Sequence, residues 1–152
     1  MTLEAWTEAG WLRAHDTRVE EIAQLWGVLE DDLKSARSGD LSPSSRFEYA
    51  YNASLKLCLV LLFACDRRLG RVGEVHHTII RVLPLVLGSG RETSADYLDA
   101  CRERRDKMDT HGAPDVCGED ADALATFARA LRDDVAAFLR VRKPDAAFML
   151  LA

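Results

Sequence analysis

The stretch from Arg104 to Gly112, RRDKMDTHG, holds the residues of this 152-residue chain whose types and spacing suggest chemistry. It places Arg105 and His111 six positions apart, near the expected end of a helix. A guanidinium binds phosphate oxygens, and an imidazole exchanges protons near neutral pH. The pair therefore fits a site that cleaves a phosphate ester. The alternative is a charged end of a surface helix with no chemical role.

The helix that carries this stretch is expected to bury one stripe of side chains. The stripe has the 3-4-3 spacing of an inward helix face and consists of Leu98, Cys101, Arg105 and Met108. A guanidinium in such a position needs an acceptor, because an unpaired buried charge costs several kcal/mol. Asp109 lies four residues after Arg105 and can pair with it along the helix.

His111 falls at the end of the same helix, where the negative end of the helix dipole favours an imidazolium. Six helical residues rotate a side chain by about 240°, so Arg105 and His111 do not share a face of a continuous helix. The two can converge only if the helix unwinds near Thr110 or if a second subunit supplies the other half. A simple cap of the helix end is the alternative role for His111.

Partners for Arg105 are expected on the helix that begins at Pro43. There, Glu48, Asn52 and Lys56 follow each other at four-residue intervals and form a polar line beside an apolar sequence. This line can meet Arg105 and form a hydrogen-bonded interior site. A structural polar network without chemistry is the alternative, because ion pairs between helices are common.

The elements that would position these residues are all helical. Apolar residues recur at three- and four-residue spacing, and no stretch alternates convincingly, so we predict an all-α fold. Five or six helices with short connections favour an up-and-down helical bundle that forms one domain over residues 1–152. The expected helices run from Thr2 through Ala9, from Asp16 or Thr17 to Ser38, from Pro43 to about Arg68, from Glu74 to about Leu87, from Thr93 or Ser94 to Gly112, and from Glu119 to Lys143. The apolar tail after Pro144 is expected to dock on the body or at a dimer contact.

The composition is that of a soluble globular protein, with 48% hydrophobic and 30% charged residues. Twenty basic and twenty-five acidic side chains give a net charge of -5, which counts against tight nonspecific binding to nucleic acid but leaves room for a local basic site. The longest apolar stretch, Leu57 to Ala64, is too short for a membrane span of about 20 residues. The start shows no secretory signal, so we expect a cytoplasmic protein without membrane contact.

No cofactor or metal site is predicted. His76 and His77 are adjacent and therefore point to different sides of a helix, and no further histidine or carboxylate completes a metal-binding spacing. We expect these two histidines to cap or pack a helix.

Three segments resemble the HEPN superfamily (higher eukaryotes and prokaryotes nucleotide-binding domain), whose members are small helical bundles. LSPSSRFEYAYNASLKL, from Leu41 to Leu57, is similar to the family stretch LSP-x-x-RF-x-x-AYNAAL. VHHTIIRVLPLVLG, from Val75 to Gly88, resembles a G-HH-x-x-x-I helix of one bacterial branch. YLDACRERRDKMDTHG, from Tyr97 to Gly112, resembles that branch's LDA-x-R-x-x-RN-x-x-x-Y segment. Their order and spacing cover nearly the whole chain.

The resemblance implies a function as well as a fold. Active HEPN ribonucleases carry an arginine and a histidine separated by four to six residues, and Arg105 and His111 match with five. It implies a homodimer whose two motifs meet across a two-fold interface in a metal-independent, RNA-cleaving cleft. Arg105 would hold the phosphate, His111 would transfer protons, and Glu48 or Asn52 would orient Arg105. The implied context is RNA or a nucleotide as ligand, and a toxin–antitoxin pair with an antitoxin-like protein partner.

Two positions depart from the family pattern. Asp106 stands where active members often have asparagine, and Thr110 stands where the closer branch tends to have an aromatic residue. That branch often lacks the catalytic histidine. The alternative function is therefore a non-catalytic HEPN interaction module, such as a dimer scaffold or the partner of a nucleotidyltransferase-type protein.

Overall fold

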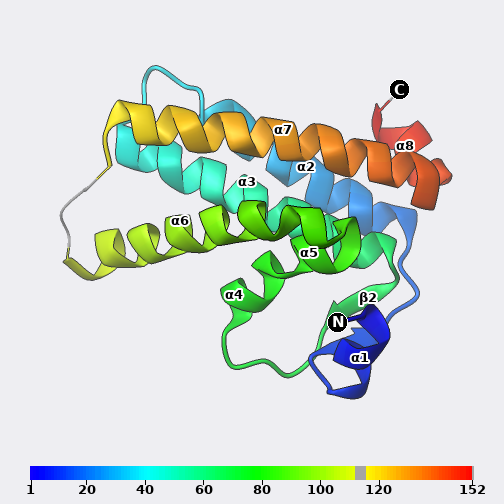
Figure 1. Ribbon diagram of the computed structural model, residues 1–152. Coiled ribbons are helices and arrows are strands. Elements are labelled where there is room, and N and C mark those ends of the chain that lie inside the picture. Colours follow the sequence, from blue (N-terminus) through cyan, green and yellow to red (C-terminus); the bar gives the residue numbers. More distant parts are fainter. Residues whose placement is uncertain (112–115, 152) are drawn as a thin grey trace.

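The computed structural model of the chain describes residues 1–111 and 116–151, with the backbone alone for residues 109–111. Figure 1 shows the long helices running alongside each other, with α4 and α5 next to α6 and with α1 at one end of the molecule. The long helices are α2 (Val19–Ser35), α3 (Pro43–Ala64), α6 (Glu92–His111) and α7 (Gly118–Arg142). The short elements are α1 (Leu3–Glu8), β1 (Leu12–Ala14), β2 (Arg67–Leu69), α4 (Val75–Ile80), α5 (Val82–Leu87), the 3-10 helix η1 (Ser89–Arg91) and α8 (Pro144–Leu151).

Helix α3 is the central element, and it packs against α2, α7, α6, α4 and α5. Its start is the predicted one: the Ser42 side chain accepts a hydrogen bond from the Ser45 backbone N–H, and Pro43 occupies the first turn. Its length and apolar composition would also suit a membrane span, but 67% of its most apolar window is buried among the other helices. The described residues lie mainly in helices, which confirms the mostly helical character of the fold.

A small antiparallel sheet is the main difference from the all-α prediction. Strand β1 pairs with β2 in the register Leu12 with Leu69 and Ala14 with Arg67. The α3 helix therefore ends at Ala64 rather than near Arg68, and Asp66 turns the chain with a positive φ of 55°. Strands of three residues are too short to show a period-two pattern, so their sequences gave no strand signal.

The segment expected to form one helix from Glu74 to Leu87 is divided into α4 and α5 at Arg81. Pro84 explains the division, because it lacks an N–H group and its ring would clash with the Ile80 carbonyl in a continuous helix. A new helix that begins at Val82 places this proline in a first turn, where no intrahelical donor is required.

The C-terminal tail forms α8, which packs on α2 and α7. Ala146 and Ala147 are buried against the body, whereas Phe148 remains 81% exposed. The predicted docking of the tail on the body is thus observed for one face of this helix.

Candidate functional site

Helix α6 presents Arg105 to the interior of the protein. In the predicted stripe, Leu98 and Cys101 are buried and Met108 packs against the core. The Arg105 side chain lies on this stripe and is 23% exposed. An arginine therefore occupies an inward position that packing alone would give to an aliphatic residue.

The Arg105 guanidinium has partners on two helices. Its Nε atom donates a hydrogen bond to Oε1 of Glu48 on α3 at 2.9 Å. Its central carbon lies 5.5 Å from the centre of the Tyr51 ring, one helical turn further along α3. On α6 itself, Nη1 lies 3.5 Å from Oδ1 of Asp106. These contacts fix the orientation of the guanidinium and place carboxylates beside it.

The polar line on α3 does not meet Arg105 as one unit. Lys56 instead binds Asp32 on α2, with 2.6 Å between Nζ and Oδ2. Asn52 is half-buried and has no hydrogen bond from its side chain within the described residues. Eight helical residues rotate a side chain by about 80° beyond two full turns, so the line winds from the side of α6 to that of α2. The structure brings only Glu48 of the three to Arg105.

The side chains of Asp109 and His111 lie outside the described residues, so their predicted roles stay predictions. The backbone of α6 is helical through His111. The backbone thus shows no unwinding near Thr110. Convergence of the pair through a second subunit stays a prediction.

His76 is an imidazole that the structure places beside the Arg105 group. Its Nδ1 atom shares a hydrogen bond of 3.0 Å with the hydroxyl of Tyr51, whose ring lies against Arg105. Burial lowers the pKa of His76, and the positive charge of Arg105 lowers it further. The neutral imidazole is therefore favoured. The sequence predicted only a capping or packing role for His76, although its segment is one of the three that resemble HEPN proteins.

A second group of charges surrounds Asp99, which lies six residues before Arg105 on α6. The Asp99 carboxylate accepts hydrogen bonds from Nδ1 of His77 at 3.1 Å, from Nη2 of Arg81 at 2.7 Å and from Nε of Arg102 at 3.2 Å. Burial raises the pKa of Asp99, but these hydrogen bonds outweigh it and keep the pKa below the ordinary value of 3.8. Arg102 also reaches Asp106 at 3.6 Å, which links this group to Arg105.

We call these residues together the α6 polar cluster: Glu48, Tyr51, His76, His77, Arg81, Asp99, Arg102, Arg105 and Asp106. A guanidinium, a neutral imidazole and a phenol in contact can bind an anion and exchange a proton. Within the described ranges, no group of three or more histidine, cysteine or acidic side chains is placed to hold a metal ion.

Comparison of the chain with protein-family models, curated proteins and solved structures gave no match.

Proposed function

We propose that the protein is a HEPN-like dimer that binds RNA or a nucleotide, with Arg105 as the residue that contacts a phosphate. The observation that carries this proposal is the Arg105 position, which is inward-facing, partly exposed and held by Glu48 and Tyr51. A guanidinium held in one orientation loses little further freedom when it binds a phosphate. The three sequence segments that resemble HEPN proteins supply the rest of the argument.

The activity implied for such a dimer is metal-independent cleavage of RNA by transesterification. His111 of one subunit takes the proton of the ribose 2′-hydroxyl, and the 2′ oxygen attacks the adjacent phosphorus. The bond to the 5′ oxygen breaks, and this oxygen leaves with the proton that His111 has taken up. Arg105 stabilises the negative charge that builds up on the phosphoryl oxygens. The helical course of α6 through His111 supports a two-subunit site, because one continuous helix keeps the two residues on different faces.

A non-catalytic interaction module is the second candidate, and Asp106 favours it. Its carboxylate lies 3.5 Å from Nη1 of Arg105 and 3.6 Å from Nη1 of Arg102. A phosphate brought to this position would meet that negative charge. The α6 polar cluster would then join helices of a dimer scaffold, or of a partner for a nucleotidyltransferase-type antitoxin.

The test is incubation of the purified protein with structured and unstructured RNA in EDTA. Arg105→Ala and His111→Ala are compared with wild type, and Arg140→Ala on α7 is the matched control because Arg140 is exposed. We expect cleavage by wild type and the control, and loss of cleavage in the other two variants. Circular dichroism of each variant verifies folding. Cleavage that both variants retain, or that wild type lacks, removes the enzyme function.

Binding separates the two candidates when no cleavage occurs. Sedimentation measures the subunit number, and fluorescence anisotropy with labelled RNA measures the affinity of wild type and Arg105→Ala. A dimer whose RNA affinity depends on Arg105 supports the binding function. A dimer with no RNA affinity supports the interaction module, and a monomer at micromolar concentration contradicts both.

A further inference from the structure

A groove on the side of α7 shares no residue with the α6 polar cluster. It lies between α7 and the end of α2 with the first turn of α3, and its volume is about 590 Å³. Ligand pockets commonly have volumes of about 300–1,000 Å³. Its charged lining consists of Arg37, Arg46, Asp122, Arg129 and Asp133.

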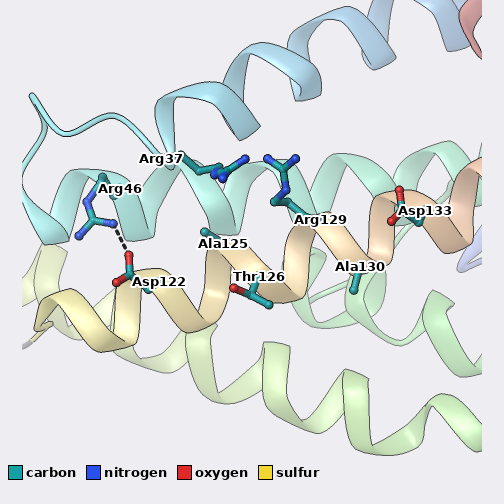
Figure 2. A pocket seen from close by; sticks show the side chains of 8 residues that line it. All are labelled: Arg37, Arg46, Asp122, Ala125, Thr126, Arg129, Ala130 and Asp133. Atoms are coloured by element: carbon teal, nitrogen blue, oxygen red, sulfur yellow. Dashed lines mark hydrogen bonds and ion pairs between the residues drawn. The ribbon is translucent and has the colours of Figure 1, made fainter.

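Each of the two carboxylates of the groove lies close to an arginine other than Arg37 and Arg129. Asp122 pairs with Nη1 of Arg46 at 2.7 Å, a contact drawn in Figure 2. Asp133 lies 3.6 Å from Nη1 of Arg132. Within the described parts of the chain, neither Arg37 nor Arg129 forms an ion pair.

Arg37 and Arg129 come from different elements and both line the groove. Arg37 directly follows the C-terminal cap of α2, and Arg129 projects from the middle of α7. In the view of Figure 2 their guanidinium groups point toward each other from the two elements. Two like charges that face each other repel, and an anion between them removes this repulsion. Guanidinium groups with several N–H donors are suited to phosphate oxygens.

The positive surface continues along α7. A neighbouring cavity of about 310 Å³ shares Arg129 and Asp133 with the groove, and it adds Lys34, Arg132 and Glu30. Arg132 pairs with Glu30, whereas Lys34 forms no ion pair within the part of the chain that the structure describes. Together the two linings hold five cationic and three acidic side chains, and this surplus of positive charge favours a ligand with more than one negative charge.

We propose that this groove binds a phosphate-bearing ligand, with Arg37 and Arg129 contacting one phosphate group and Lys34 placed for a second. Arg46 keeps its pair with Asp122 and forms the end wall of the site. The site does not depend on the activity of Arg105 or His111. Its ligand is a small phosphate compound or the phosphates of an RNA strand, which present the same oxygens to the arginines.

The experiment is a titration of the full chain with inorganic phosphate and with pyrophosphate, at constant ionic strength set by chloride. Two-dimensional NMR of backbone and arginine N–H groups reports the site, and its readout is independent of RNA cleavage. We expect saturable shifts around Arg37 and Arg129, and tighter binding of pyrophosphate than of phosphate. Arg37→Gln and Arg129→Gln should each weaken pyrophosphate binding about tenfold, because each removes charge-assisted hydrogen bonds.

Arg140→Gln on the same helix and Arg13→Gln on β1 are matched controls, because both arginines are exposed and lie outside the groove. Binding that is absent in wild type, or equally weakened by the control variants, overturns the proposal. Unchanged binding in the double variant Arg37→Gln with Arg129→Gln overturns it as well. Competition between pyrophosphate and a short single-stranded RNA then identifies the source of the phosphate. If pyrophosphate displaces the RNA from the groove, the phosphate belongs to RNA. If no RNA is displaced from the groove, the ligand is a small phosphate compound.

Discussion

The Nε atom of Arg105 on α6 donates a hydrogen bond to Oε1 of Glu48 on α3, and the two atoms are 2.9 Å apart. The contact joins residues 57 positions apart in the chain and ties α6 to the central helix. The side chains are 23% and 33% exposed, so the pair is neither fully buried nor fully solvated. A pair of this kind can hold a guanidinium in place while leaving it within reach of a ligand.

The energetic coupling of this pair can be measured with a double-mutant cycle of Arg105→Gln and Glu48→Gln. We expect a coupling free energy of about 1 kcal/mol in urea denaturation, because the pair is hydrogen-bonded but still partly screened by water. The same cycle with Arg140 in place of Arg105 should give none. Additive effects of Arg105→Gln and Glu48→Gln would mean that the contact does not contribute to stability.

The pKa of His76 offers a direct test of the geometry around Arg105. Burial is the main cause of its depression below 6.5, and the charge of Arg105 is the next. Arg105→Gln should therefore raise the pKa of His76 part of the way toward 6.5. The imidazole proton signals in an NMR titration measure it, and Arg140→Gln is the control. An unchanged pKa in Arg105→Gln would show that the charge of Arg105 does not act on His76.

Asp99 should contribute to stability at neutral pH and lose that contribution in acid. Its folded pKa lies below the ordinary value of 3.8, so the folded state favours the carboxylate more than the unfolded state does. The contribution is complete above pH 3.8 and is lost as the pH falls through the folded pKa. Asp99→Asn should lower the free energy of unfolding by about 2 kcal/mol at pH 7, because it leaves Arg81 and Arg102 without their buried acceptor.

Urea denaturation between pH 7 and pH 3 verifies this prediction. Wild type and Asp99→Asn should approach each other in stability as the pH falls. Asp145→Asn is a suitable control because Asp145 is exposed. A difference between wild type and Asp99→Asn that stays constant down to pH 3 would contradict the linkage.

The sequence predicted the parts of the fold that local signals specify. The predicted helix start at Pro43 is the start of α3, and the 3-4-3 spacing on α6 placed Arg105 on the inward face. Helix periodicity and the cost of an unpaired inward charge predicted that Arg105 would find a partner on the line of Glu48, Asn52 and Lys56. They did not distinguish Glu48, which pairs with Arg105, from the other two residues.

Contacts between distant elements were not predictable in the same way. Tyr51 and His76 meet only because α4 packs against α3, and nothing local in either sequence signals that contact. Lys56 pairs with Asp32 because the polar line winds around α3, a geometry that depends on which helices surround it. The strands of the small sheet are stabilised by each other and not by their own pattern.

That sheet can be tested at Gly70, which follows β2. Its backbone N–H donates to the Trp11 carbonyl at 2.7 Å, and a Cβ atom at this position would clash with the Gly10 carbonyl oxygen. Gly70→Ala should therefore lower the free energy of unfolding by about 2 kcal/mol, because the paired backbones must separate. Gly73→Ala is the matched control, since a Cβ there meets no atom within 4 Å. Equal stability of the two variants in thermal denaturation would contradict the close approach.

The two-subunit site makes a prediction that a single-chain site does not. If Arg105 of one subunit acts with His111 of the other, a mixed dimer of Arg105→Ala and His111→Ala keeps one site with both wild-type groups. Random exchange makes half of the dimers mixed, so the mixture should recover about a quarter of wild-type RNA cleavage although each variant alone is inactive.

Exchange of subunits is measured with a fluorescent label on each variant, and cleavage is followed in the same sample. A mixture of Arg105→Ala with the double variant Arg105→Ala/His111→Ala is the control, and it should stay inactive because no arginine is present. A mixture of the single variants that exchanges subunits but stays inactive would show that the two residues do not act across the interface. His76 would then be the imidazole that the structure places next to the Arg105 group.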